Sequence, residues 1–414
     1  MNGEKKNGSA GVVILAIVMV ALLAVAGVTF FIILNKESNR NSGNEGTAES
    51  SNAAPGAVSG QSVLSDETEE KLRTLREVID EAYLFGTEDV DFDTAVIRAY
   101  MDALGDPYSV YYTPEEYDDM MESSRGTFFG IGVSIQQDVN DMSVTVIQVF
   151  RGSPAEEAGV KPGDVIYAVD GVPVGDDDIN VTVTKVRGPE NSKVKITFYR
   201  PSLDKNIDFE ITRREVQVDS AVGEMLDDHI GLISLTSFDE ITYGQFAKAF
   251  NELADNGMQG VIFDLRNNGG GLLSSVVDIV DALAPEGIIT YTLDKNGNRS
   301  EYKSDAADAL TIPAVILTNG NTASASEIFT AALHDYGKAT VVGTTTFGKG
   351  IVQMIYPLND GSGLKLTVSR YYTPNGVCIH GEGIDPDVEV EEDPETEEDE
   401  QLLEAIRILK EKMK

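Results

Sequence analysis

Residues 260–284 read GVIFDLRNNGGGLLSSVVDIVDALA, and their pattern gives the clearest prediction of the fold class. An apolar run, GVIFDL, leads into a glycine-rich turn, and LLSSVVDIVDALA follows with the apolar spacing of a helix. The same order recurs downstream, where AVILT precedes a polar turn and SASEIFTAALHDYG. Strands that alternate with helices predict parallel β-α-β units, so we expect residues 216–391 to form an α/β core with helices covering its sheet.

The region before this core shows two different sequence patterns. Residues 126–215 contain short alternating runs, and FGIGVSIQ, SVTVIQVF, DVIYAVDG and KVKITFYR are each predicted to be a strand of a small β-rich domain. SPAEEAG and DINVTVTKV are predicted to be short helices between those strands. Residues 66–125 instead carry apolar side chains at helical spacing, with one helix expected over 94–104 and another beginning after Thr113 with a capping box.

The N-terminal residues predict where in the cell the protein lies. Residues 11–34 are uncharged and long enough to cross a bilayer as a helix, and lysines before them favour a cytoplasmic segment over 1–10. A signal peptide cleaved after residues 24–26 is the alternative, but the apolar run continues beyond that point. We therefore expect an uncleaved single-pass membrane anchor, a flexible linker over 35–65 and an extracytoplasmic remainder.

Composition excludes several classes of protein. The chain has 69 acidic and 32 basic residues, and its net charge of −37 repels nucleic acid, so no nucleic-acid partner is expected. Cys378 is the only cysteine, which excludes an intrachain disulfide and a cysteine-pair metal site. Residues 392–414 are predicted to be an acidic linker followed by a short amphipathic helix.

The stretch GTTTFGKG at 343–350 contains the G-x-x-x-x-G-K core of a phosphate-binding loop. That motif requires Ser or Thr after the lysine and then a helix. Here Gly350 follows, and IVQMIYPL with the turn signal NDGSG is typical of a strand entering a hairpin. The phosphate loop is therefore disfavoured, and Lys349 needs another role.

Two loops leave the carboxyl ends of predicted core strands, RNNGGG at 266–271 and NGNTASAS at 319–326. Ligand sites of open parallel sheets form there, so we expect the loops to meet. Successive glycines expose N–H groups that suit an oxyanion, and hydroxyls at a helix N-terminus suit a nucleophile. The alternative is purely structural, with the hydroxyls as N-caps and the glycines as turn residues.

A serine nucleophile needs a base, and the chain has three histidines. His334 lies ten residues after Ser324 on one predicted helix, about 15 Å along its axis, and cannot reach it. His229 is expected at a strand edge, whereas His380 lies in a loop and stays a candidate. Lysine is the other base used with serine, because a desolvated ammonium group loses its proton near neutral pH, and the apolar neighbours of Lys349 suit that role.

Several ordered motifs resemble one family. TASASEI, followed twenty-five residues later by FGKG and then VQ, is similar to the carboxyl-terminal processing peptidases, or tail-specific proteases, which are serine–lysine endopeptidases. GIGVSI and GSPAEEAGVKPGDVIYAVDGVPV resemble their PDZ domain, and DLRNNGGGLL and YYTPNGVCIHGEGIDPDVEV resemble their protease core. The resemblance implies an α/β, crotonase-like β-α-β protease core with an inserted PDZ domain and an N-terminal helical region.

The resemblance also implies the catalytic residues. Ser324, twenty-five positions before Lys349, becomes the nucleophile and Lys349 the general base. Gln353 matches the glutamine that orients the lysine. The implied reaction is acyl transfer to the serine, and it calls for no metal or cofactor.

Three further positions carry over to the same site. The oxyanion hole would consist of the backbone N–H groups of Gly270 and Ala325, and Glu327 matches a supporting acidic residue. One departure is Gly269, which stands where the family usually has proline.

The PDZ domain implies recognition of C-termini. Phe129, Gly130, Ile131 and Gly132 match the loop that binds the terminal carboxylate. The expected partners are proteins or peptides with accessible, apolar C-termini, and Arg187 is a candidate gating residue that contacts the core. The N-terminal and C-terminal helices resemble elements that build homodimers in some relatives.

Two rival functions remain at this point. A catalytically inactive, membrane-tethered PDZ scaffold would bind C-termini without cleaving them, although every required polar residue is present. A crotonase-like acyl-CoA enzyme would use similar glycine loops for thioester chemistry, but it gives the PDZ-like domain and the anchor no role.

Overall fold

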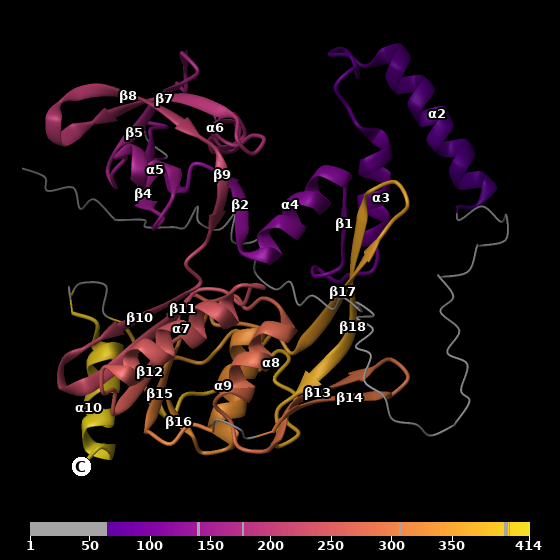
Figure 1. The fold of residues 1–414 in the computed structure, drawn as a ribbon. Helices are drawn as coiled ribbons and strands as arrows, with labels where there is room; N and C mark the ends of the chain where they lie inside the picture. Colours follow the sequence, from indigo (N-terminus) through magenta and orange to yellow (C-terminus); the bar gives the residue numbers. More distant parts are fainter. Residues whose placement is uncertain (1–63, 139–140, 176–177, 306–308, 393–395, 397) are drawn as a thin grey trace, which may run out of the picture. The chain divides into compact units, whose positions relative to one another are not determined.

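A computed structural model describes residues 64–414 apart from 139–140, 176–177, 306–308, 393–395 and 397 (Figure 1). The predicted cytoplasmic segment, the transmembrane anchor and nearly all of the linker lie outside the described residues. Within the described part, no helix combines the length and apolar character needed to cross a membrane. The chain divides into two compact units with a boundary between Leu104 and Gly105.

The smaller unit contains α2 (Asp66–Ala82) and α3 (Phe92–Asp102). α3 begins two residues earlier than predicted because the carboxylate of Asp91 accepts the N–H of Thr94 and caps the first turn. α2 has no buried residue, and it exposes apolar side chains that include Leu75 and Val78.

The core of the larger unit is a six-stranded sheet of order β10-β11-β12-β15-β16-β19, parallel except for β10. Its strands are β10 (Ala221–Met225), β11 (Ile230–Leu235), β12 (Gly260–Asp264), β15 (Ala314–Thr318), β16 (Ala339–Gly343) and β19 (Val388–Glu389). This sheet confirms the predicted α/β class with parallel β-α-β units. The finer crotonase-like assignment stays a prediction.

Helices cover both faces of this sheet (Figure 1). Alternate residues of β12 point to opposite faces, as strand geometry requires. Phe263 packs in the cluster that includes α7 (Thr242–Asp255), α8 (Leu273–Asp281) and α9 (Ala325–Asp335). Ile262 packs with α10 (Glu400–Lys412), the predicted C-terminal helix.

A second, five-stranded sheet completes the core and contains the predicted hairpin. β17 (Ile351–Pro357) and β18 (Gly363–Tyr372) pair antiparallel on either side of the NDGSG turn. β13 (Gly287–Asp294), β14 (Arg299–Ser304) and β1 (Val110–Tyr112) complete the sheet. β1 comes from the region predicted to be helical, and it is followed by α4 (Pro114–Arg125), whose predicted capping box at Thr113 is confirmed.

The small β-rich domain has a six-stranded sheet with its own buried core. The prediction of one strand over FGIGVSIQ is wrong, because the chain turns at Gly132, where φ is 83°. β2 (Thr127–Gly130) therefore pairs with β9 (Arg214–Gln217), and β3 (Val133–Gln137) joins the domain sheet. Its other elements are β4 (Val144–Val149), α5 (Pro154–Ala158), β5 (Val165–Val169), β6 (Val172–Pro173), α6 (Ile179–Val186), β7 (Lys193–Arg200) and β8 (Lys205–Thr212).

Candidate active site

The two loops predicted to meet are joined by direct hydrogen bonds. The carbonyl oxygen of Asn268 accepts the N–H of Ala323 at 3.0 Å and the hydroxyl of Ser326 at 2.9 Å. The hydroxyl of Thr322 donates to the carbonyl oxygen of Leu265 at 2.9 Å. Asn268 is fully buried, so the glycine loop after β12 and the serine loop after β15 form one packed unit.

Ser324 occupies a strained backbone position directly before α9. Its φ of 57° and ψ of −116° lie in a region that non-glycine residues rarely adopt. Its N–H donates to Glu327 Oε2 at 2.8 Å, and its carbonyl oxygen accepts the Tyr371 hydroxyl at 3.1 Å and the N–H groups of Glu327 and Ile328 at 2.9 and 3.0 Å. Backbone strain of this kind, over-determined by its surroundings, is typical of functional positions.

The two predicted oxyanion amides lie beside this serine. A Cβ atom on Gly270 would stand 2.8 Å from Ser324 Cβ and 2.9 Å from the nitrogen of Ala325, so only glycine fits there. The N–H of Ala325 is the first of α9 and has no acceptor within its helix. The N–H of Gly270, in contrast, donates to Asn268 Oδ1 at 2.9 Å in this structure.

Lys349 is buried, with only 3% of its surface exposed. Its Nζ lies 4.6 Å from the centroid of the Tyr108 ring. Burial, together with the positive charge of Lys365, lowers the pKa of Lys349 to about 7, against the opposing influence of the carboxylates of Glu327 and Asp106. A large fraction of Lys349 is therefore neutral at physiological pH.

Glu327 links the serine loop to the lysine loop. Its buried carboxylate accepts the N–H groups of Ser324 and Lys349, each at 2.8 Å, and the N–H of Gly348 at 2.7 Å. The hydroxyl of Thr346 adds a fourth hydrogen bond at 2.6 Å. Burial raises the pKa of Glu327, and these four donors act in the opposite direction. The position predicted to be supporting is thus the structural link between the predicted nucleophile and base.

Gln353 is fully buried on β17, on the strand that follows the lysine. Its Nε2 lies 3.4 Å from the hydroxyl of Thr367, and its Oε1 has no hydrogen-bond partner among the described residues. An orienting contact from Gln353 to Lys349 therefore stays a prediction.

Two of the three histidines lie away from the serine, whereas His380 belongs to a loop that packs against Gly350, directly after the lysine. His334 Nε2 is 3.0 Å from Asp387 Oδ1, near the far end of α9. His229 and His380 are both exposed, whereas Ser324 is buried. This geometry favours Lys349 over a histidine as the base.

The predicted carboxylate loop and Arg187 both contact the carboxylate of Glu122 on α4. The N–H of Phe129 donates to Glu122 Oε1 at 2.9 Å. Arg187 Nη1 lies 3.5 Å from Glu122 Oε2 and 3.6 Å from Asp119 Oδ1, and its guanidinium group lies over the Phe128 ring. Glu122 thus occupies a position where an anion is held by a backbone amide and an arginine.

The other three residues of the predicted carboxylate loop have backbone groups that are hydrogen-bonded within the β-rich domain. Gly130 pairs with Arg214 in the β2–β9 ladder. Ile131 is buried, and its carbonyl oxygen accepts the N–H of Ala155. The carbonyl oxygen of Gly132 accepts the N–H of Phe150.

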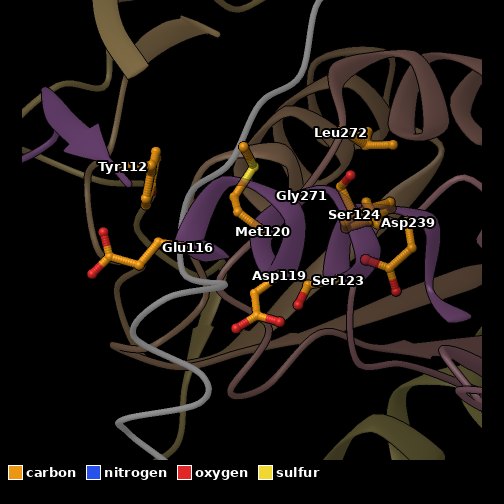
Figure 2. A pocket seen from close by; sticks show the side chains of 10 residues that line it. Tyr112, Glu116, Asp119, Met120, Ser123, Ser124, Asp239, Gly271 and Leu272 are labelled. Carbon is orange, nitrogen blue, oxygen red and sulfur yellow. The ribbon is translucent and has the colours of Figure 1, made fainter. Parts of the chain in front are cut away.

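A pocket of about 250 Å³ lies at the end of the glycine loop and is lined by Gly271 and Leu272 (Figure 2). Side chains of α4 also line it, and Met120 among them supplies an apolar surface. Asp239 also lines the pocket, and burial raises its pKa to about 6 although the Ser237 hydroxyl donates to it. The remaining lining residues are Tyr112, Glu116, Asp119, Ser123, Ser124 and Phe238.

Three residues around the site are not predicted by the sequence motifs. Tyr371 fixes the serine loop, and Tyr108 and Lys365 lie near Lys349. Tyr371 and Lys365 are on β18, and Tyr108 precedes β1. Only the long-range pairing of these strands reveals their proximity, so no local sequence signal marks them.

The fold and the site place the protein in the class of peptidases that contain a PDZ domain. The family model for peptidase family S41 matches residues 229–390, and the PDZ domain model matches residues 145–200. The chain belongs to the S41 family of carboxy-terminal processing proteases. The family expectation from the sequence motifs is thereby confirmed.

Individual relatives agree with this placement. The chain is 36% identical over 323 residues to the carboxy-terminal processing protease CtpA of Bacillus subtilis, covering 78% of this chain and 69% of that protein. It is also 36% identical over 301 residues to a carboxyl-terminal-processing protease of Synechocystis, covering 72% and 70%. A solved S41-type structure from Bacteroides fragilis has a TM-score of 0.53 at 16% identity, covers 82% of this chain and 97% of that chain, and supports the fold.

Proposed function

We propose that the protein is a membrane-anchored serine endopeptidase that cleaves proteins recognised by their C-termini, with Ser324 as nucleophile and Lys349 as general base. The observation that carries the proposal is that the carboxylate of Glu327 accepts the backbone N–H groups of both residues. A strained serine at a helix start and a lysine with a lowered pKa supply the two groups that acyl transfer needs.

The reaction follows from the protonation state of Lys349. Its neutral amine takes the proton of the Ser324 hydroxyl as the serine oxygen attacks the peptide carbonyl carbon. The resulting ammonium group then protonates the leaving amine, and water attacks the acyl-enzyme with the same lysine as base. Donors aimed at the oxyanion each contribute about 10²- to 10³-fold in rate.

One of the two proposed oxyanion donors already has an acceptor within the glycine loop. Asn268 Oδ1 holds the N–H of Gly270, which must be exchanged for a hydrogen bond to the oxyanion. Gly270 has a φ of 104°, in a region open to glycine, so no Cβ atom opposes a rotation of the peptide group before it. The structure thus fits a resting state that becomes active when substrate displaces this internal hydrogen bond.

The PDZ domain supplies recognition and gating. A substrate's terminal carboxylate would displace Glu122 from the Phe129 amide and from Arg187. The side chain of Arg187 is 42% exposed, and ion pairs at such exposure contribute at most about 1 kcal/mol, so the exchange is cheap. When substrate binds, Arg187 would release α4. Because α4 packs on the core through Met120, this change would reach the core.

Two further parts of the proposal concern assembly. The apolar segment at 11–34 would anchor the chain, with the protease outside the cytoplasm. The apolar side chains of α2 would pack against a second copy, because a helix with no buried residue leaves its apolar side chains in water.

Labelling with a serine-reactive fluorophosphonate tests the proposal. Wild type should react at Ser324, and Ser324→Ala and Lys349→Ala should each abolish labelling and peptide cleavage without unfolding the protein. An inactive PDZ scaffold predicts instead that C-terminal peptides bind while Ser324 is never labelled. That result would remove the catalytic assignment.

A further inference from the structure

The turn that enters β1 is fixed against the strand next to the lysine. The carboxylate of Asp106 accepts the N–H of Tyr108 at 3.0 Å and the hydroxyl of Ser109 at 2.6 Å. Ser109 Oγ in turn accepts the N–H of Thr367 on β18 at 3.1 Å. The turn is therefore held in one position by hydrogen bonds at both its start and its end.

This segment places one tyrosine against each of two buried lysines. The Tyr108 ring lies 4.6 Å from Lys349 Nζ, and the Tyr112 ring lies 5.4 Å from Lys365 Nζ. Lys349 and Lys365 are 3% and 8% exposed. Tyr108 itself is half-buried, so its side chain contacts Lys349 and is also partly accessible to solvent.

We propose that Tyr108 is a positioning residue that shields the amine of Lys349 from water and so sets the lower end of the pH range in which the enzyme works. The inference rests on the proposed function of Lys349 as base, and Tyr108 acts through Lys349 rather than on substrate. It gives the segment 106–112 a role in catalysis although it lies far from the core in sequence.

The charges that face Lys349 come from three other elements. Lys365 on β18 disfavours its ammonium form, whereas Glu327 on α9 and Asp106 before β1 favour it. The Tyr108 ring has two opposite effects, because its π-face attracts an ammonium group and its bulk excludes water. Loss of hydration outweighs the attraction of one ring, so removing Tyr108 should make Lys349 harder to deprotonate.

The rate of Ser324 labelling by a fluorophosphonate, measured from pH 5 to 10, tests the proposal. Wild type and Tyr108→Phe should share a midpoint near 7. Tyr108→Ala should shift the midpoint upward by about one pH unit or more, which lowers labelling at pH 7 about fivefold and restores it at high pH. A purely structural role would lower the rate at every pH and leave the midpoint in place.

Controls separate this proposal from the proposed function. Tyr291→Ala removes a ring that lies 3.7 Å from the Arg299 guanidinium carbon, and it should not move the midpoint. If Tyr108→Ala fails to fold by circular dichroism, Tyr108→Val replaces it with the same expectation. An unmoved midpoint in a folded variant, or an equal shift in Tyr108→Phe, overturns the shielding role. Absence of labelling in wild type overturns the proposed function instead.

Discussion

Glu327 Oε2 accepts the backbone N–H of Lys349 at 2.8 Å, and the same oxygen accepts the N–H of Ser324 at the same distance. One buried carboxylate oxygen therefore fixes the separation of two loops that are twenty-five residues apart in sequence. Hydrogen bonds to a buried charged acceptor are stronger than those between neutral groups. The predicted nucleophile and base are thus held together by their backbones.

Glu327→Gln should loosen this link. An amide NH₂ cannot accept hydrogen bonds from the donors that surround the carboxylate, so we expect the free energy of unfolding to fall by about 2 kcal/mol. Misplacement of the serine and lysine loops should reduce kcat/KM about 100-fold. Urea unfolding and peptide cleavage measure the two effects. The exposed Glu252→Gln is the matched control, and wild-type stability and activity in Glu327→Gln would contradict the role of the link.

Asp239→Asn should stabilise the protein at high pH. Burial raises the pKa of Asp239 from 3.8 to about 6, so the folded state disfavours the ionised form. The stability present below the ordinary pKa is lost as pH rises through about 6, and the loss amounts to up to about 3 kcal/mol. The variant should gain that amount at pH 8 and nothing at pH 3. Thermal or urea unfolding at both values decides, and equal effects at both would refute the assignment.

Glu122→Ala should strengthen binding of C-terminal peptides. The substitution frees the Phe129 amide and Arg187, and an exposed ion pair of up to about 1 kcal/mol corresponds to about fivefold in Kd. Fluorescence anisotropy with a peptide ending in an apolar residue and a free carboxylate measures the change, with the exposed Glu115→Ala as control. Weaker binding in Glu122→Ala would rule out competition for the carboxylate loop.

Arg187→Ala tests the gating role separately. Loss of the guanidinium group should weaken peptide binding and remove stimulation of cleavage by a non-cleavable C-terminal peptide, because the peptide carboxylate loses its cationic partner. Basal and stimulated kcat/KM are compared with wild type. If both values match wild type, Arg187 has no part in gating.

The double variant Leu75→Asp and Val78→Asp should disrupt assembly. Two charges on the exposed apolar residues of α2 oppose burial against a second copy, so the proposed dimer should become monomeric at a concentration where the wild type associates. Sedimentation velocity measures the state, and Glu77→Gln on the same helix is the control. A dimer that persists in the double variant would place the interface elsewhere.

Local sequence patterns predicted the elements that depend on local physics. The run around Val261 and the glycine loop after it gave the β-α unit, and the capping box at Thr113 was found from three residues. The break at Gly132 was missed because a positive φ is invisible in an alternating pattern. Tyr108 was missed for a different reason, since its position depends on pairing with a strand more than two hundred and fifty residues away.

The pH dependence of peptide cleavage shows whether Lys349 is the general base. Lys349 must be neutral to act as base, so kcat/KM should rise with pH to a plateau with a midpoint near 7, and it should fall tenfold per pH unit well below the midpoint. Lys349→Met, which keeps the bulk of the side chain and removes the amine, should lose activity at every pH. Substantial cleavage by Lys349→Met, or a wild-type midpoint near the ordinary lysine value of 10.5, would contradict the account.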